Sequence, residues 1–310
     1  MRRVWRALGL CLAVFAAAPA AANPAAVAEA VMGLGRDTRW TQVSVTPIGF
    51  DAFHAQGLVK VGDVFFVTAV EILERTTFYP EPRDGFDRSQ GRGQGWLFKM
   101  NAKGELLAKI KLGEGAVYHA GGLDFDGKRL WVPVAEYRPG GQSILYSVDP
   151  ATLKVTEQLR VDDHIGAVAM DVVGKTLVGV NWGSAGFHAW PLDPTGRPTR
   201  GGGKAISNGA QYIGYQDCHG AGPRRMLCSG VAGYRSRRDV PPTAIGGVEL
   251  IDLRDFRQMW QAPVQAWNAA GQAMTSNAAF FEPTPEGVRG YFLPEDGRGN
   301  LYVYEAAAAR

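Results

Sequence analysis

The sequence predicts an all-β fold, a β-propeller of four-stranded blades, because one segment recurs and because the strands around it follow in hairpin order. Residues 53–71 recur without a gap as residues 118–136, and seven of the 19 aligned positions are identical. Repetition at a fixed spacing indicates one supersecondary unit that is used again. Four strands in meander order are the composition of one propeller blade.

Each copy of the repeat is expected to form a β-hairpin. Gly62 and Gly127 centre the two turns, and aromatic and branched apolar residues follow each turn. Residues 65–67 and 130–132 are apolar on both alternating faces of the strand. Strands of this kind are buried between two layers. Each sheet is therefore expected to pack between two others, as the blades of a propeller do.

The predicted hairpins place a histidine beside a glutamate. If each hairpin is symmetric about its turn, His54 lies opposite Glu71 and His119 lies opposite Glu136, with Cβ atoms about 5 Å apart. A third unit begins at His164, so three of the five histidines begin three consecutive units. Because the first strand of each blade lines the channel, we expect the three imidazoles near one channel mouth.

Five units are predicted, which gives five blades. The fifth unit lacks a fourth strand, and the strand predicted at residues 40–47 has no partner nearby in the sequence. We expect this N-terminal strand to fill the place and to close the ring, which leaves no exposed edge. Six blades are the alternative, with a degenerate blade inside residues 197–210 or 258–271.

The first 22 residues have the pattern of a secretory signal peptide. Arginines give a basic start, residues 8–18 are apolar, and Ala22 ends a small-residue cleavage site before Asn23. The apolar core is short for a stable membrane span, so an uncleaved anchor is the disfavoured alternative. The mature chain, residues 23–310, is expected to be one soluble propeller domain without a membrane span, periplasmic or secreted.

The charge balance argues against nucleic acid as a partner. The chain has 33 Lys and Arg against 30 Asp and Glu, and the leader contains three of the arginines. The mature chain is therefore close to neutral. Proteins that bind nucleic acid usually present an excess of positive charge to the phosphates.

Two cysteines of the mature chain, Cys218 and Cys228, flank a turn centred on Pro223. This spacing sets them opposite each other on paired strands, where a disulfide fits. Disulfides also persist in the oxidising compartment that the leader indicates. Metal binding by the pair with His219 is the disfavoured alternative, because a structural metal site needs further thiols or a histidine cluster.

Several segments together resemble a family of exported bacterial propeller proteins of unknown function. The resemblance spans nearly the whole mature chain and is carried by residues 53–59, 118–124, 132–137, 162–166 and 215–218. More distantly, the succession of glycine, apolar strand, aspartate-glycine turn and apolar strand is similar to gluconolactonase-like and NHL-like propellers. Propellers with this pattern have different activities, so the resemblance implies the fold and not the reaction.

Imidazoles and carboxylates at a channel mouth form a candidate metal and catalytic site. We expect His54, His119 and His164 as ligands of one divalent metal, Ca, Zn or Mg, and Glu71 and Glu136 as catalytic carboxylates. A metal-bound water can attack a lactone or ester at neutral pH, and a histidine beside a glutamate can instead be a general base. The competing interpretation is structural, with hydrogen bonds from these residues fastening neighbouring blades.

Other residues are expected at the same rim. Asn181 and Trp182 end the second strand of the third unit, where units one and two have Glu71 and Glu136. In units four and five, the places that match the histidines are taken by Tyr212 and by Asn277 or its neighbour Ser276. We expect Asn181, Trp182, Tyr212 and Asn277 to bind the ligand, with packing as the alternative for the tryptophan. Asp217 is expected to cap a turn, with a role as a ligand as the disfavoured alternative.

Two long loops, residues 74–95 and 232–246, contain several arginines and are expected on the same face as the histidines. They would favour an anionic ligand at the channel mouth. The loop 74–95 is also long enough to form a lid.

The sequence contains no nucleophile elbow, phosphate-binding loop, zinc-protease helix or paired Cys-x-x-Cys motif. Serine hydrolases, NTPases and haem proteins are therefore disfavoured. The leading hypothesis is an exported propeller that binds a small, anionic or sugar-derived molecule at the channel mouth and hydrolyses it as a gluconolactonase-like, metal-dependent enzyme. The alternative is a non-catalytic scaffold that binds another envelope protein.

Overall fold

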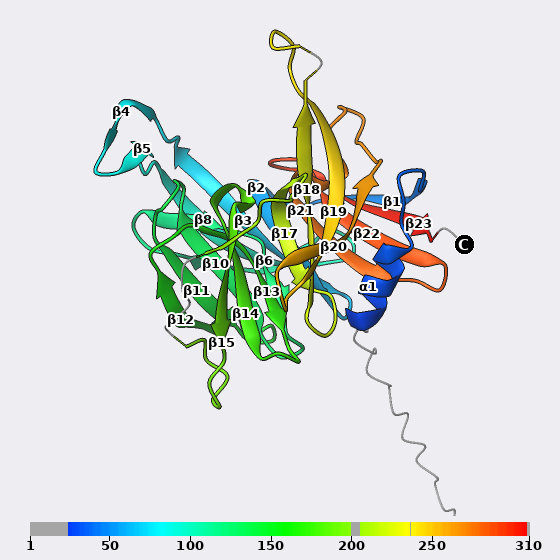
Figure 1. The fold of residues 1–310 in the computed structure, drawn as a ribbon, viewed down its shortest axis with the longest axis horizontal. Helices are drawn as coiled ribbons and strands as arrows, with labels where there is room; N and C mark the ends of the chain where they lie inside the picture. Colours follow the sequence, from blue (N-terminus) through cyan, green and yellow to red (C-terminus); the bar gives the residue numbers. More distant parts are fainter. Residues whose placement is uncertain (1–23, 200–204, 236, 309–310) are drawn as a thin grey trace, which may run out of the picture.

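The computed structural model describes residues 24–199, 205–235 and 237–308. The predicted signal peptide lies outside these residues. Five antiparallel sheets of blade type surround one axis, as the sequence predicted (Figure 1). No sixth blade occurs in the part of the chain that the structure describes.

The blades succeed one another along the chain, each from the axis outward. Blade one contains β2 (His54–Val61), β3 (Val64–Glu74), β6 (Arg92–Asn101) and β7 (Leu106–Leu112). Blade two contains β8 (Val117–Ala120) and β9 (Asp124–Phe125), which share the inner position, then β10 (Leu130–Glu136), β11 (Ser143–Val148) and β12 (Val155–Val161). Blade three contains β13 (Ile165–Asp171), β14 (Thr176–Asn181), β15 (Gly186–Pro191) and β16 (Ile206–Ser207).

Blade four contains β17 (Gly214–Gly220), β18 (Arg225–Tyr234), β19 (Thr243–Asp252) and β20 (Arg257–Val264). Blade five contains β21 (Ala278–Pro283), β22 (Gly287–Leu293), β23 (Asn300–Ala307) and β1 (Trp40–Pro47). The N-terminal strand β1 pairs antiparallel with β23, in the outer place that the fifth unit left vacant. One sheet thus contains the first and last strands of the chain.

Short elements complete the fold. They are the helix α1 (Pro24–Met32), the hairpin β4 (Phe78–Arg83) and β5 (Phe86–Arg88), and the 3₁₀ turns η1 (Trp182–Ser184) and η2 (Met274–Ser276). Helix α1 buries Ala28 and Val31 against blades four and five. The β4–β5 hairpin and the ends of β18 and β19 project from the body of the propeller (Figure 1). No helix among the described residues is long and apolar enough to cross a membrane.

Apolar clusters fill the gaps between neighbouring blades, which explains why the inner strands are apolar on both faces. On β3, Phe65 packs between blades one and five, whereas its neighbour Phe66 packs between blades one and two. On β10, Leu130 faces blade one and the fully buried Trp131 faces blade three. Adjacent residues of a strand point to opposite faces, so a strand that packs on both sides needs apolar residues at every position.

The predicted pairing of histidine with glutamate is wrong by one residue. His54 pairs with Val70 and His119 pairs with Ala135, because the register shifts inside the first hairpin and between β8 and β9. In blade one the extra residue is Gln56, a β-bulge between Ala55 and Gly57. A bulge leaves one residue unpaired and changes the direction of the strand, and a count outward from the turn does not detect it.

The predicted disulfide is confirmed. Cys218 on β17 pairs directly with Cys228 on β18, and their sulfur atoms are bonded, with Cα atoms 4.1 Å apart. Both residues are fully buried. The bond therefore joins the inner two strands of blade four within the core.

Candidate functional site

The inner strands of the first three blades bring their histidines to one mouth of the channel. His54, His119 and His164 line a single cavity of about 280 Å³. His54 begins β2, His119 lies in β8 and His164 immediately precedes β13. The same position in the three repeats thus leads to the same place in the molecule. We call this hollow the ring cavity.

The rest of the ring cavity is aromatic and polar but uncharged. Ala167 and Val180 add a small apolar part, and the polar and aromatic side chains that join the histidines are Gln56, Tyr137, Asn181, Trp182, Ser184, Tyr215 and Gln216. None of the described residues that line it is an Asp, Glu, Lys or Arg. The ring cavity therefore suits a neutral polar group better than an ion.

His164 is fixed by a neighbouring blade. Its Nδ1 lies 2.7 Å from the carbonyl oxygen of Glu136 and donates a hydrogen bond to it. This bond sets the tautomer and leaves Nε2 as an acceptor. Burial lowers the pKa of His164 to about 4, so the ring is neutral at pH 7. The bond also links blade three to blade two, as the structural interpretation of the repeated histidines expected.

His54 is held from both sides of its ring. Its Nδ1 lies 2.8 Å from Oδ1 of Asp296, and its Nε2 lies 2.7 Å from the side-chain amide of Gln56. The imidazole lowers the pKa of the Asp296 carboxyl mainly through this hydrogen bond. His54 and Gln56 therefore form a polar edge of the ring cavity, and Asp296 holds the imidazole from outside the lining.

His119 is the least satisfied of the three imidazoles. Its ring is buried and stacks on Tyr137 at 4.6 Å between centroids, and the ring of His164 is 5.7 Å away. Its Nδ1 has no hydrogen-bond partner among the described residues. Burial, with smaller contributions from His164 and His54, lowers the pKa of His119 well below its usual value. His119 is therefore a neutral ring with an unused nitrogen.

The three histidines share a cavity, and two of them are hydrogen-bonded to protein. Within the described ranges, no group of three or more His, Cys, Asp or Glu side chains is arranged to hold a metal ion. Both ring nitrogens of His54 and one of His164 are already hydrogen-bonded to protein. The role of these histidines as metal ligands stays a prediction.

The two predicted catalytic glutamates lie outside the ring cavity. Oε2 of Glu71 accepts a hydrogen bond from the indole N–H of Trp96 at 2.9 Å. Oε2 of Glu136 lies 2.6 Å from Nε of Arg138 in an ion pair. Neither carboxylate lines the cavity. Each therefore has a structural contact in place of the expected contact with a histidine.

The four predicted ligand-binding residues divide into two pairs. Asn181 and Trp182 line the ring cavity, and the ring of Trp182 is 4.7 Å from that of His164. Tyr212 and Asn277 do not line it. Tyr212 donates its hydroxyl hydrogen to the carbonyl of Ala262, and Asn277 donates its amide hydrogen to a backbone carbonyl in blade five.

Comparison with known proteins gives a family. Residues 12–309 match the family of unknown function DUF6454. The chain belongs to this family. The resemblance to a propeller family of unknown function is thereby confirmed. No curated protein matches the DUF6454 chain.

Several solved structures are similar to this DUF6454 protein at low sequence identity. A bifunctional GH43-CE protein of Bacteroides eggerthii is 13% identical with a TM-score of 0.50, over 84% of this chain and 34% of that one. The tail fiber of Staphylococcus aureus phage P68 is 7% identical with a TM-score of 0.47, over 88% of this chain and 53% of that one. Regucalcin, a calcium-binding protein from Agrobacterium tumefaciens, is 16% identical with a TM-score of 0.45, over 86% and 93%.

The DUF6454 chain thus spans about a third of the first protein and about half of the second. At 13% identity, the likeness to the Bacteroides protein shows the fold alone.

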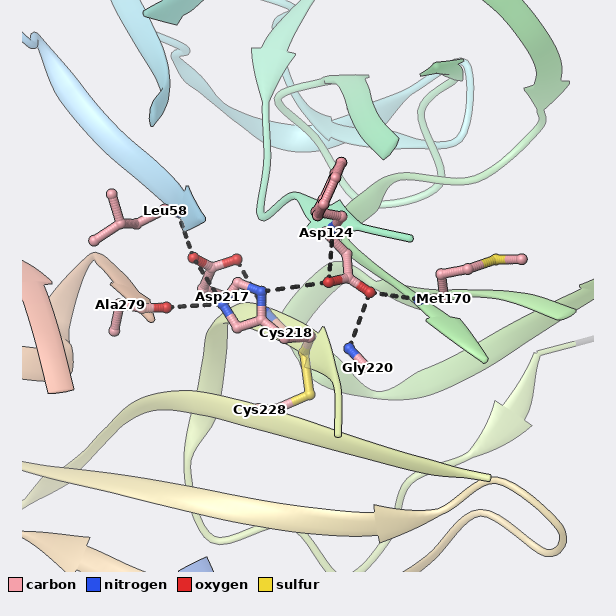
Figure 2. A network of polar contacts seen from close by, with 10 residues as sticks. Leu58, Asp124, Met170, Asp217, Cys218, Gly220, Cys228 and Ala279 are labelled. Atoms are coloured by element: carbon pink, nitrogen blue, oxygen red, sulfur yellow. Dashed lines mark hydrogen bonds and ion pairs between the residues drawn. A yellow bond between two sulfur atoms is a disulfide. The ribbon is translucent and has the colours of Figure 1, made fainter. Parts of the chain in front are cut away.

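The centre of the DUF6454 propeller contains a buried network that the sequence did not reveal. The expectation that Asp217 caps a turn is wrong, because β17 places its carboxylate at the axis. Oδ2 accepts a hydrogen bond from the backbone N–H of Leu58 at 2.7 Å, and Oδ1 accepts one from Cys218 at 3.1 Å (Figure 2). The carboxylate therefore ties blade four to blade one.

His219 lies between two carboxylates in this network. Its Nδ1 is 3.7 Å from Oδ1 of Asp124, and its Nε2 is 3.6 Å from Oδ2 of Asp217 and 2.9 Å from the Ala279 carbonyl oxygen (Figure 2). Burial by itself would lower the pKa of His219, but the two carboxylates outweigh burial and raise it to about 10. The direction of this shift favours a charged imidazole at pH 7, while burial raises the pKa of the Asp217 carboxyl against the lowering effect of His219.

Asp124 completes the network. Its Oδ2 accepts hydrogen bonds from the backbone N–H groups of Met170 at 2.7 Å and Gly220 at 2.9 Å. Together with Leu58 and Ala279, these contacts join the inner strands of all five blades (Figure 2). A further cavity of about 500 Å³, lined in part by Asp124, opens at the opposite end of the inner strands. The network therefore separates the two mouths of the channel.

Sequence reasoning missed five polar residues of the ring cavity in this DUF6454 protein, Gln56, Tyr137, Ser184, Tyr215 and Gln216. Gln56 and Gln216 are both the extra residue of a bulge in an inner strand. A glutamine near the start of each of these two inner strands was the available signal. Tyr137 directly follows the repeated glutamate of the second unit but has no counterpart in the first.

Proposed function

We propose that the ring cavity binds a small sugar-derived ligand. The observation that carries the proposal is the convergence of three histidines, three other aromatic rings and several amides on a hollow of about 280 Å³. This volume is near the lower end of the range of about 300–1,000 Å³ for small-molecule pockets. It suits a single sugar ring.

The side chains match the two faces of a sugar. Tyr137 and Trp182, with ring centroids 5.3 Å apart, offer aromatic surface to the C–H face of a pyranose. Gln56 and Gln216 offer amide donors and acceptors to hydroxyl groups. The buried Oδ1 of Asn181 has no partner among the described residues and is a further acceptor for a hydroxyl.

Hydrolysis of a lactone or ester is an extension of this proposal. The neutral His164, with Nε2 free to accept a proton, is the best-placed general base in the cavity. A general base is most effective when its pKa is near the working pH, whereas the pKa of His164 is lowered to about 4. Binding is therefore supported more strongly than hydrolysis.

Protein binding is a second candidate function. The projecting hairpins have exposed aromatic side chains at their ends, with Phe78 66% and Tyr234 52% exposed. The hydrogen bond from His164 to Glu136 shows how a repeated histidine can serve the scaffold alone. In this alternative the propeller presents its projecting hairpins to another envelope protein and the ring cavity has no ligand.

We also propose that the protein is periplasmic or secreted. The disulfide between Cys218 and Cys228 supports an oxidising compartment, and the first 22 residues have the pattern of a cleaved leader. Cell fractionation with mass spectrometry of the N-terminus tests this, with Asn23 as the expected first residue. A cytosolic protein that starts at Met1 would contradict it.

Calorimetry with a panel of monosaccharides and sugar lactones tests the ligand proposal. We expect saturable binding of at least one sugar, and loss of about tenfold or more in affinity in Trp182→Ala, because the substitution removes aromatic surface from the cavity wall. Lactone hydrolysis can be followed on the same samples.

Trp267→Ala is the matched control, since Trp267 is 40% exposed and does not line the ring cavity. It should bind sugars as the wild type does. If no member of the panel binds, or if Trp182→Ala binds as tightly as Trp267→Ala, the proposal is wrong.

A further inference from the structure

A second cavity adjoins the ring cavity. It measures about 320 Å³ and is lined by Ile72, Arg75, Thr76, Phe78, Arg88 and Tyr118, together with His119 and Tyr137. The last two residues also line the ring cavity. The stacked pair of His119 and Tyr137 is therefore a wall that the two hollows share. We call the second hollow the arginine cavity.

The two hollows differ in charge. Arg75 and Arg88 both line the arginine cavity, and no described residue in its lining is an Asp or Glu. The lining of the ring cavity has neither sign of charge. A ligand that extends through both would therefore meet a neutral, aromatic part and a positively charged part.

Arg88 is held in a fixed position at this place. Its guanidinium lies over the rings of Phe78 at 4.4 Å and Trp182 at 4.9 Å. Its Nε and Nη2 donate to the two carboxylate oxygens of Asp87, each at 2.9 Å. The side chain is only 13% exposed, and its Nη1 makes no hydrogen bond to a described residue. A guanidinium fixed in this way has donors left for a ligand.

The position of Arg88 also connects the β4–β5 hairpin to the ring cavity. Trp182 belongs to blade three and lines the ring cavity, whereas Arg88 ends β5 of the hairpin that blade one projects. The contact between them places a positive charge at the rim of the proposed sugar site.

Arg75 is the second positive charge of the arginine cavity, and unlike Arg88 it has no close counter-charge among the described residues. It is exposed, and no described carboxylate lies within 4.0 Å of its guanidinium. Its field contributes to the lowered pKa of Asp296, the partner of His54. The positive charge of Arg75 therefore acts toward the ring cavity as well.

We propose that the ligand bears an anionic group, a carboxylate or a phosphoryl group, that lies in the arginine cavity against Arg75 and Arg88 while the sugar ring occupies the ring cavity. This inference rests on the proposed function and specifies its substrate class as sugar acids or sugar phosphates. Arginine donors match the planar carboxylate and the phosphoryl oxygens.

The test compares matched sugars by calorimetry. The pairs are glucose with glucuronate, galactose with galacturonate, and glucose with glucose 6-phosphate. We expect the anionic member of at least one pair to bind about tenfold or more tightly than its neutral member at low salt. Arg75→Gln and Arg88→Gln should remove this preference and leave the affinity for the neutral sugar within about twofold.

Arg83→Gln is the matched control. Arg83 lies on the same hairpin, over the ring of Tyr79 at 4.6 Å, and lines neither cavity. Arg83→Gln removes one positive charge from the same hairpin and should keep the preference for the anionic sugar. Circular dichroism and thermal unfolding show whether each variant remains folded. If Arg88→Gln does not fold, the comparison of Arg75→Gln with Arg83→Gln decides.

The outcomes separate the two proposals. Neutral and anionic sugars that bind equally would overturn the anionic inference and leave the sugar site intact. A preference that Arg83→Gln removes as fully as Arg75→Gln would also overturn it, since the effect would then be the general charge of the hairpin. If no sugar of either kind binds, the proposed function itself fails and this inference fails with it. A carboxylate preference and a phosphate preference are distinguished by the uronate and phosphate arms.

Discussion

His164 has two possible roles, because its Nδ1 bonds the Glu136 carbonyl in the scaffold and its Nε2 faces the ring cavity. An alanine substitution would remove both nitrogens at once. An asparagine places its amide nitrogen near the position of the histidine Nδ1, so His164→Asn keeps a donor for the Glu136 carbonyl and removes the remaining ring nitrogen from the cavity. We expect His164→Asn to be close to the wild type in stability and to lose sugar affinity. His164→Ala should in addition lose about 1 kcal/mol of unfolding free energy, because the Glu136 carbonyl loses one of its two hydrogen bonds and keeps only the one from the backbone N–H of Arg138.

Urea unfolding and calorimetry on the two variants measure these effects. Equal destabilisation by both substitutions would show that asparagine does not replace the donor. Unchanged sugar binding in His164→Asn would show that the free ring nitrogen contributes nothing to a ligand.

The repeated glycine Gly57 lies where two neighbouring inner strands approach each other closely. A Cβ on Gly57 would lie 2.7 Å from the backbone nitrogen of Leu123 and 2.8 Å from Cα of Gly122, in the neighbouring blade. Backbone atoms of two inner strands cannot separate without opening the ring, so we expect Gly57→Ala to destabilise the protein by about 1–3 kcal/mol or more. Gly35→Ala is the control, since no atom lies within 4 Å of its added Cβ.

Thermal and urea unfolding of these two glycine variants provide the measurement. If Gly57→Ala is as stable as Gly35→Ala, the close approach of the strands does not constrain the repeat. The expected difference would account for the presence of glycine at the same place in both copies.

The candidate site was only partly predictable from single residues. His54, His119 and His164 were found because repetition in sequence becomes convergence in a ring. Glu71 and Glu136 were equally repeated, but their carboxylates bond to Trp96 and Arg138, outside the cavity. Repetition alone does not distinguish a residue of the cavity from a residue of the scaffold, because both recur with the blade.

At the scale of elements, patterns of apolar residues predicted strands well and register less well. The strands β3 and β10 are apolar at successive positions because they pack on both faces, and the sequence shows this directly. The bulge at Gln56 depends on how β2 meets its neighbours at the axis, and no local pattern reveals it. The β4–β5 hairpin was expected as a loop, since the alternation in residues 74–95 is interrupted by prolines and glycines.

In the hairpin of β17 and β18, by contrast, the register predicted from the turn is correct at the cysteines. Symmetry about Pro223 predicted Cys218 opposite Cys228, and the structure confirms it. The bulge of this hairpin lies at Gln216, beyond the cysteines as counted from the turn. The same method failed for His54 because its bulge lies between the turn and the histidine. The position of the bulge therefore decides which predictions of register hold.

For the whole molecule, the five-bladed arrangement was predictable but the contacts at its axis were not. Leu58, Asp124, Met170, Asp217 and Ala279 are far apart in the sequence and meet only when the ring forms. Asp124 and Asp217 do not occupy equivalent places in their blades, since Asp124 lies on β9 and Asp217 follows the bulge of β17. No other unit has a histidine at the place of His219. A network of this type depends on the completed ring, so it becomes visible only in three dimensions.

The charged state of His219 makes the stability of the whole propeller depend on pH. The pKa of His219 is raised from 6.5 to about 10 in the folded protein by the two carboxylates, against the opposing effect of burial. A raised pKa in the folded state contributes stability that is complete below about pH 6.5 and is lost as the pH rises toward 10. We expect the unfolding free energy to fall across this window by on the order of 1 kcal/mol per pH unit.

His219→Gln should be less stable than the wild type at pH 6.5, and the difference should shrink toward pH 10. His119 and His164 do not interfere, because their lowered pKa values reduce stability as the pH falls and so act below this window. Urea unfolding of both proteins at several pH values measures the effect. An imidazole titration of the wild type by NMR provides a second measurement if the variant does not fold. The prediction fails if the unfolding free energies of the wild type and His219→Gln change in parallel with pH, or if the His219 ring is neutral at pH 8. Either result would show that the five blades are joined without a charge at the axis.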